Sequence, residues 1–223
     1  MILPALSPRL AHIAARVPAD RRLVDVGCDH ALLPLHWLLA NPAATAVGID
    51  NKDSPLRVAT ANRARYGLTD RLQLVRAEGL PPPLPLANDC VVIAGMGGQS
   101  IAAILQRAMP RQGLFLLSPH TRPDYLRAAL PGCGLAITAE SVSLDGGRAY
   151  AVITAAPADT AVEYAPSDRW LGPVLRRQLD AAHADPALDL YFRRLERHLS
   201  NVVRHDPSVR EALTLLRERR RHE

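Results

Sequence analysis

Hydrophobic positions along the chain fall into short apolar runs that alternate with longer amphipathic stretches. Such alternation is typical of an α/β protein with a doubly wound, mainly parallel sheet. The short runs predict strands over residues 22–27, 45–50, 72–75, 90–94, 114–117, 135–142 and 150–154. The longer stretches predict helices over residues 31–40, 55–66, 99–108 and 123–130.

The last two predicted strands have no helix between them. They are separated by the turn Asp145-Gly146-Gly147, so we expect an antiparallel hairpin at the edge of the sheet. Five helix-linked strands followed by a hairpin resemble the layout of the class I S-adenosylmethionine methyltransferases. By this analogy the fold is a Rossmann-like sheet of seven strands.

The two ends of the chain carry helical patterns. Residues 1–18 predict an amphipathic helix that Ser7 caps and in which Pro8 takes the first position. After residue 158 no strand pattern remains, and we expect a catalytic domain over 1–158 and a helical domain over 159–223. In the tail, apolar residues at heptad-like spacing predict an antiparallel, coiled-coil-like appendage: Leu188, Phe192, Leu195, Leu199 and Val202, flanked by helices carrying Leu171, Leu175 and Leu179 and then Val209, Leu213 and Leu216.

Composition indicates a globular protein with a sizeable core, since 48% of the residues are hydrophobic and 22% are charged. No stretch approaches the roughly 18 apolar residues of a membrane span, and the first residues lack the basic flank of a secretory signal. Three widely spaced cysteines favour a reducing, cytoplasmic setting: Cys28, Cys90 and Cys133. The histidines show no metal-ligand spacing, so we expect no metal. We favour a monomer over an oligomer.

The positive charge of the chain indicates a polyanionic partner. Its net charge is +5, its pI is about 9.6, and Lys52 is the only lysine. Arginine pairs phosphates bidentately, although an arginine-rich composition also follows from GC-rich coding sequence. The arginines of the tail fit either a nucleic-acid contact or a solvated helix face. We expect RNA phosphates to be bound by Arg9, Arg16, Arg21 and Arg22, with His120 and Arg122 as further candidates.

Residues that follow the predicted strands are the candidates for a ligand site, because ligands of open parallel sheets bind beyond the carboxyl ends of the strands. The first strand runs into Asp25-Val26-Gly27-Cys28-Asp29-His30, where Gly27 permits a sharp turn. The segment lacks the G-x-G-x-x-G of dinucleotide-binding proteins, which argues against a dehydrogenase. Cys28 is either an activated thiol or a small buried filler.

The next three strand ends complete the predicted site. Asp50 can accept hydrogen bonds from both ribose hydroxyls of an adenosyl group, or it caps the following helix. After the third strand, Glu78 can accept from an adenine amino group. After the fourth, Ala94-Gly95-Met96-Gly97-Gly98 places bare backbone N–H groups at the start of a helix.

Several segments together resemble the bacterial tRNA adenine-22 N1-methyltransferase family. They are LSPRLAHIAARVP, LVDVGCDHALLPL, IAGMGGQSIAAIL and Trp170-Leu171-Gly172-Pro173 before a helix, and the resemblance covers nearly the whole chain. It implies methylation of N1 of an adenosine in tRNA, at position 22, with S-adenosyl-L-methionine as donor. It also implies cofactor contacts from Asp25, Gly27, Cys28, Asp29, His30, Asp50, Asn51, Glu78, Gly79, Ala94 and Gly95.

The target base is expected at the glycine turn, with Gly95, Met96 and Gly97 facing it. Adenine N1 already carries a lone pair, so catalysis is mainly alignment, and Asp29 is the candidate that stabilises the methylated adenine cation or takes a proton from its N6 amine.

The sequence departs from the pattern of the family at four places. Cys28 replaces serine, Asp50 replaces glutamate, Glu78 replaces aspartate, and Ser118-Pro119-His120 replaces Gln-Pro-Asn. The last change borders the acceptor side of the cleft. Two other functional hypotheses stay open at this point. One is a methyltransferase of the same fold that acts on a small molecule or another nucleotide, and the other is an RNA-binding protein that has kept the fold without catalysis.

Overall fold

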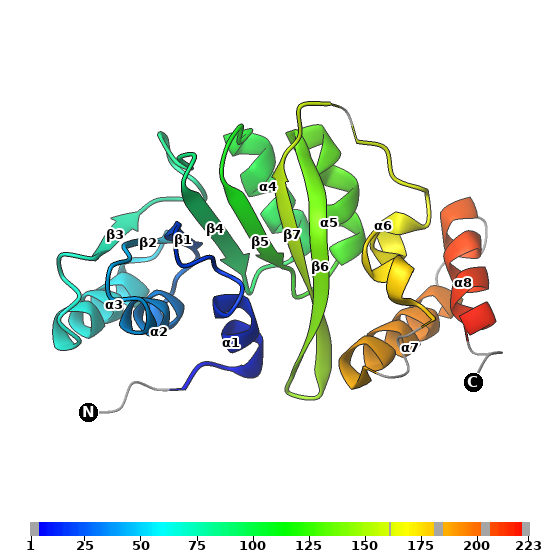
Figure 1. Cartoon of the computed structure of the whole chain (residues 1–223), viewed down its shortest axis with the longest axis horizontal. Helices are drawn as coiled ribbons and strands as arrows, with labels where there is room; N and C mark the ends of the chain where they lie inside the picture. The colour runs from blue at the N-terminus through cyan, green and yellow to red at the C-terminus, as the bar shows by residue number, and fades with distance from the viewer. Residues whose placement is uncertain (1–4, 161, 181–184, 202–205, 220–223) are drawn as a thin grey trace.

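One mixed sheet of seven strands forms the centre of the protein (Figure 1). The computed structural model describes residues 5–160, 162–180, 185–201 and 206–219. The strand order is β3-β2-β1-β4-β5-β7-β6, in which only β7 runs antiparallel to both of its neighbours. The strand order reverses beside β1, which lies between β2 and β4. The bounds are β1 Arg22–Val26, β2 Ala46–Asp50, β3 Leu72–Arg76, β4 Asp89–Ala94, β5 Leu114–Ser118, β6 Leu135–Asp145 and β7 Arg148–Pro157.

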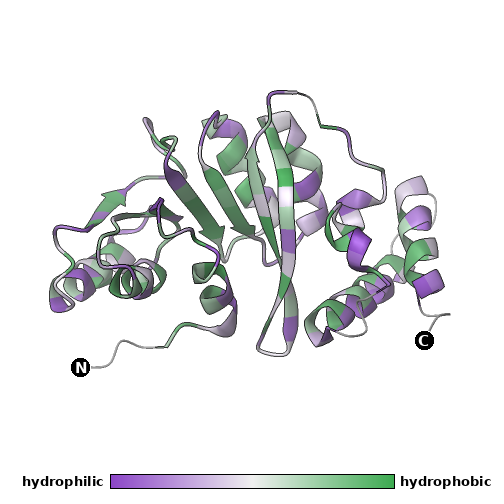
Figure 2. Cartoon of the chain, in the orientation of Figure 1, coloured by the Kyte–Doolittle hydropathy of each residue, from purple (hydrophilic) through white to green (hydrophobic). Residues whose placement is uncertain are grey.

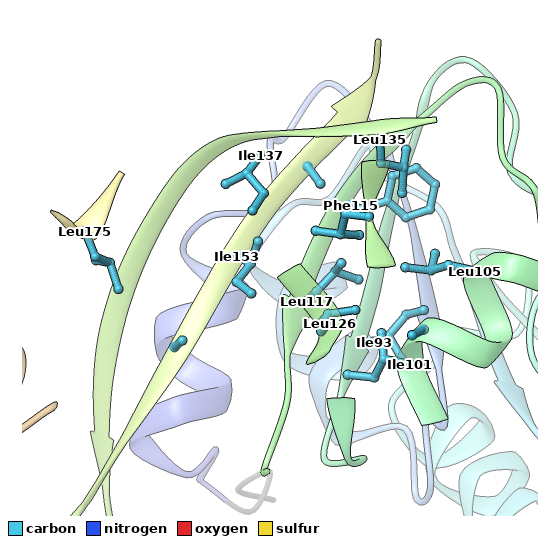
Figure 3. Close-up of a cluster of buried hydrophobic side chains, with 14 of the residues drawn as sticks. Ile93, Ile101, Leu105, Phe115, Leu117, Leu126, Leu135, Ile137, Ile153 and Leu175 are labelled. Atoms are coloured by element: carbon cyan, nitrogen blue, oxygen red, sulfur yellow. The ribbon is translucent and has the colours of Figure 1, made fainter. Parts of the chain in front are cut away.

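Helices cover both faces of this sheet, as the alternating pattern predicts. Successive strand residues point to opposite faces, so Val91 and Ile93 of β4 join one cluster of buried side chains, and Cys90 and Val92 join the other. Figure 3 shows the first cluster, in which α4 packs Ile101 against the sheet. The helices are α1 Pro8–Ala14, α2 Leu32–Ala40, α3 Asp53–Arg65, α4 Gly98–Ala108 and α5 Pro123–Ala129.

Hydropathy follows these layers. Figure 2 shows the central strands as largely hydrophobic, whereas the helices carry hydrophilic residues on their outer sides. No helix within the described ranges is long and apolar enough to span a membrane. The expected Rossmann-like sheet with an antiparallel edge hairpin is confirmed, and so is the presence of C-terminal helices.

The N-terminal helix is shorter than predicted. Ser7 caps it through a 3.4 Å hydrogen bond from the N–H of Leu10, and Pro8 takes the first position, as expected. The helix ends at Ala14, well before the predicted limit at residue 18, because the chain turns ahead of Pro18 to enter β1. Residues 1–4 of the prediction lie outside the described part of the chain.

The first predicted helix of the tail is broken into two short pieces. These are α6 Asp168–Leu171 and a 3₁₀ turn over Leu175–Gln178, and they are separated by Gly172 and Pro173. Gly172 has a φ of +86°, a conformation that side chains with a Cβ rarely adopt, and proline cannot continue the hydrogen bonding of the preceding turn. Two longer helices follow, α7 Pro186–Asn201 and α8 Pro207–Arg219.

The tail packs on the sheet and does not stand apart from it. Figure 1 places α6 and α7 on the β6 side of the sheet and α8 beyond them; α7 contacts β6, β7 and α8. Of the predicted heptad seam, Leu188, Phe192 and Leu199 are buried in the same cluster as the sheet residues, and Leu195 is partly buried. Val202 lies outside the described residues. The division of the chain at residue 158 stays a prediction, because the two parts share this core.

A buried ion pair joins the sheet to the tail. Arg127 on α5 donates from Nε to the Glu140 carboxylate on β6 at 2.8 Å, and both side chains are at most 1% exposed. The same guanidinium donates to the carbonyl of Trp170 and to the hydroxyl of Tyr191, while Glu140 accepts from the backbone N–H of Val174. Burial by itself lowers the pKa of Arg127, but the Glu140 carboxylate outweighs it and raises the pKa above its usual value.

Candidate active site

A cavity of about 730 Å³ lies at the carboxyl ends of β1, β2 and β4, where the strand order reverses. Its size suits a nucleoside-containing cofactor, and its position is that of ligand sites in open parallel sheets. Most of the predicted cofactor residues line it: Gly27, Cys28, Asp29, His30, Asp50, Asn51, Glu78, Gly79, Ala94 and Gly95. Met96, predicted to face the target base, lines it as well.

The turn after β1 is tied to the end of β2 through the Asp50 carboxylate. One of its oxygens accepts from the N–H of Asp29 at 3.1 Å and the other from the N–H of Lys52 at 3.0 Å. The N–H groups of Gly27 and Cys28 both donate to the carbonyl of Ile49. Each carboxylate oxygen keeps a further lone pair, so Asp50 can still accept two ribose hydroxyls.

The same turn holds two residues other than glycine in the left-handed region. Asp29 has a φ of +50° and Ala31 a φ of +59°. Left-handed backbone at residues with a Cβ is uncommon, and such strain concentrates at functional sites. The Asp29 side chain is largely exposed, and its carboxylate lies 3.6 Å from the imidazole of His30.

Asp25 and Cys28 are buried beneath this turn. Asp25 does not line the cavity, and burial together with the nearby Asp50 carboxylate raises its pKa to about 7. Burial, with Asp25 next, raises the pKa of the Cys28 thiol well above its usual value. A neutral thiol packed against Gly48 is a small filler, and this favours the second of the two roles considered for Cys28.

Helix α4 supplies a wall of the cavity that the strand-end reasoning missed. Ser100, Ile104 and Arg107 all line the cavity, and Arg107 donates to the Glu78 carboxylate at 3.2 Å. Their spacing of four and three residues places them on one face of the helix, so periodicity together with the preceding glycine turn is the signal that identifies them. Glu78 is thus placed at the cavity, paired with Arg107 and largely exposed.

The glycine turn after β4 is joined to the turn after β5 by two backbone hydrogen bonds. The N–H of Gly98 donates to the carbonyl of Thr121 at 2.7 Å, and the N–H of His120 donates to the carbonyl of Met96 at 2.8 Å. A Cβ atom at Gly98 would collide with the carbonyl oxygen of Arg122, so this close approach requires glycine. Gly97, also predicted to face the base, precedes this contact as the N-cap of α4 and does not itself line the cavity.

The structure does not bring the four predicted RNA-binding arginines together. Arg21 and Arg22 lie at the amino end of β1, the opposite edge of the sheet from the cavity. Arg22 is held by two hydrogen bonds of 2.8 and 2.9 Å to Asp89, so its guanidinium is already paired. Arg16 is exposed near α1, whereas Arg9 is buried and lines the cavity. Strand direction therefore separates Arg21 and Arg22 from Arg9, and RNA binding by these arginines stays a prediction.

His120 and Arg122 lie on the turn after β5. The imidazole of His120 lies 5.4 Å from the ring of Tyr150, and burial followed by the charge of Arg9 lowers the pKa of His120. Arg122 is paired with Asp124 at 3.0 Å and remains about half exposed. No group of three or more potential metal-ligating side chains occurs among the described residues.

The fold and the cavity define the class of the protein. A sheet of this strand order, with an acidic residue at the end of β2 and a glycine turn after β4 at the reversal point, is that of the class I methyltransferases. The chain belongs to the family described as "Methyltransferase domain", whose profile matches residues 6–153.

Similar proteins narrow this assignment. A tRNA (adenine(22)-N(1))-methyltransferase of Bacillus subtilis is 27% identical over 183 residues, which is 79% of this chain and 77% of that protein. The structure of Streptococcus pneumoniae Sp1610 in complex with S-adenosyl-L-methionine has a TM-score of 0.80 at 25% identity and covers 96% and 99% of the two chains. M. capricolum TrmK in complex with S-adenosyl-homocysteine has a TM-score of 0.70 at 20% identity, with 97% of each chain covered. The resemblance inferred from the sequence is thereby confirmed.

Proposed function

We propose that this chain is an S-adenosyl-L-methionine-dependent methyltransferase that methylates N1 of an adenosine in tRNA, at position 22. The observation that carries the proposal is the match to the Bacillus subtilis enzyme, combined with a cavity whose lining suits an adenosyl cofactor. The structural relatives match almost end to end, so the C-terminal helices belong to the similarity as well. A tRNA partner and a cytoplasmic location follow from this proposal.

The residues of the cavity suit the cofactor. S-adenosyl-L-methionine supplies the methyl group. Asp50 would hold the ribose hydroxyls, the turn from Gly27 to His30 would receive the methionine part, and Glu78 would accept from the adenine amine. Gly95 and Met96 lie on the side of the cavity nearest β5, which leaves that side for the target base.

Adenine N1 presents its lone pair at neutral pH, so the protein need not remove a proton before methyl transfer. The nitrogen becomes cationic on methylation, and a nearby carboxylate stabilises that charge. Three carboxylates line the cavity: Asp50 ties the turn after β1 to β2, Glu78 pairs with Arg107, and Asp29 does neither, since it is the backbone N–H of Asp29 that donates to Asp50. We therefore assign Asp29 this role in the transition state.

Methyl transfer to RNA tests the proposed function directly. Labelled S-adenosyl-L-methionine is incubated with the protein and total bacterial tRNA, and the nucleosides are then separated. We expect label in 1-methyladenosine. When a tRNA with guanosine at position 22 is the substrate, we expect no labelled 1-methyladenosine. Label in another nucleoside would support a tRNA methyltransferase but would exclude adenine N1 as the methylated atom. Absence of label despite cofactor binding would favour a small-molecule acceptor. Absence of cofactor binding would favour an RNA-binding protein of this fold without catalytic activity.

Replacing Asp29 separates its role in catalysis from cofactor binding. Asn adopts the left-handed conformation as readily as Asp, so Asp29→Asn removes the charge and leaves the backbone of the turn in place. We expect kcat to fall by about 10-fold or more, the range of a lost transition-state electrostatic contact, with cofactor affinity within about twofold. Asp53→Asn is the matched control, because Asp53 is exposed on α3 and pairs with Arg76. Unchanged turnover in Asp29→Asn would remove Asp29 from the mechanism.

A further inference from the structure

Arg9 is a buried cation inside the cavity. It lies on α1, its side chain lines the cavity next to Leu10, and only 8% of the residue is exposed. Its terminal nitrogen Nη1 is fully buried and has no hydrogen-bond partner among the described residues. A buried donor of a charged group without a partner is costly. Other described residues, such as Arg63 and Ser118, also hold a buried polar atom of this kind, but Arg9 is the one that lines the cavity, where a ligand can supply the missing acceptor.

The surroundings of Arg9 compensate its charge only in part. The guanidinium carbon lies 5.1 Å from the centroid of the Tyr150 ring, a cation–π contact that supplies no hydrogen-bond acceptor for Nη1. Burial lowers the pKa of Arg9, and the charges of Tyr150 and Asp145 oppose this shift without reversing it. An arginine stays protonated even so, because its usual pKa is so high.

The position of Arg9 is held firmly by the packing of α1. The helix lies against β6, where His12 Nε2 is 2.9 Å from the hydroxyl of Ser141, and it also contacts α2. Ile13 on the same helix is fully buried. The backbone of Arg9 is therefore held beside the cavity that this residue lines, and its guanidinium is not a solvated surface charge.

We propose that Arg9 is an oxyanion anchor of the cavity. Its ligand is a carboxylate or phosphate group that enters with a bound molecule and takes the hydrogen bonds that the protein leaves open. Two sources of this group fit the proposed function, on which the inference rests. One is the carboxylate of the methionine part of the cofactor, since Arg9 lines the same cavity as the turn from Gly27 to His30; the other is a backbone phosphate beside the target nucleotide.

The experiment compares Arg9→Gln with wild-type protein in two binding measurements by calorimetry. The probes are S-adenosyl-homocysteine, which carries the carboxylate, and 5′-methylthioadenosine, which lacks the whole amino-acid part. If Arg9 binds the carboxylate, the affinity for S-adenosyl-homocysteine falls by about 10- to 100-fold and that for methylthioadenosine stays within about twofold. Arg111→Gln is the control, since it removes an exposed arginine just before β5, at the opposite edge of the sheet.

The second arm tests a phosphate of the RNA. In that case both small molecules bind Arg9→Gln normally, KM for tRNA rises by about 10-fold, and the slope of log(kcat/KM) against log[salt] becomes shallower by about 0.7–0.9. Arg9→Lys keeps the charge and is expected to recover part of either loss. Circular dichroism of each variant checks that it is folded.

Two results would overturn the anchor. In one, Arg9→Gln is folded and both the cofactor affinities and the tRNA parameters equal those of wild type. In the other, the affinity for methylthioadenosine falls as much as that for S-adenosyl-homocysteine, which marks a structural role of Arg9. The proposed function is tested separately by the wild-type protein: no binding of S-adenosyl-homocysteine there rejects the function and this inference with it, whereas normal binding with unaltered variants rejects the anchor alone.

Discussion

Replacing Asp50 by Ala is expected to weaken S-adenosyl-homocysteine binding by about 100-fold or more. Two hydrogen bonds from ribose hydroxyls to a carboxylate contribute about 1.5–3 kcal/mol each, and every 1.4 kcal/mol is a factor of ten in affinity. The substitution also releases the N–H groups of Asp29 and Lys52, so the turn after β1 loses its tie to β2. Isothermal titration calorimetry measures the affinity, and labelled methyl transfer measures the matching loss of kcat/KM.

Two companion variants make this result specific. Asp53→Asn removes an exposed carboxylate just three residues away, and its ion pair with Arg76 is of the solvent-exposed kind that contributes little. We expect it to bind within about twofold of wild type. Asp50→Asn keeps the size of the side chain but presents one amide nitrogen to an N–H donor, so it should bind nearly as poorly as Asp50→Ala. An Asp50→Ala protein that binds normally would show that Asp50 only ties together the turns after β1 and β2, through the N–H groups of Asp29 and Lys52.

Replacing Arg127 by Met is expected to lower the free energy of unfolding by about 3–5 kcal/mol. The substitution leaves the Glu140 carboxylate buried without its cation, and breaking one partner of a buried pair costs about this much. The carbonyl of Trp170 and the hydroxyl of Tyr191 lose their donor as well. For a protein of this size the loss corresponds to a Tm lower by about 6–20 °C, measured by thermal and urea denaturation.

The exposed pair of Arg76 and Asp53 provides the control for this effect. Both side chains are more than 60% exposed, so Arg76→Met should change the stability by about 1 kcal/mol at most. The double variant Arg127→Met with Glu140→Leu should recover part of the loss, since no isolated charge remains in the core. Arg127→Met with wild-type stability would mean that the pair does not hold the tail helices on the sheet.

All the predicted cofactor residues except Asp25 were found together at the cavity because strand ends have local signals. Asp50 and the glycine turn each follow a short apolar run, and parallel strands bring their carboxyl ends to one edge whatever the rest of the chain does. The site residues on α4 were missed because that reasoning considered only the residues directly after each strand. If the glycine turn is taken as the start of the helix, the spacing of four and three residues identifies Ser100, Ile104 and Arg107 as the face of α4 that lines the cavity.

What the sequence by itself determined is the set of elements and their order, since hydrophobic period, proline and glycine act over a few neighbouring residues. It also determined the turn residues of the candidate site. The tertiary structure alone decided which arginine does what, because each partner lies far away in the chain. Arg22 meets Asp89, Arg127 meets Glu140 and Tyr191, and Arg9 meets Tyr150. Arg22 forms an ion pair at the start of β1, Arg127 forms an ion pair in the core, and Arg9 lines the cavity with a buried nitrogen that has no partner among the described residues. These differences follow from burial and from distant partners, which only the packed fold determines.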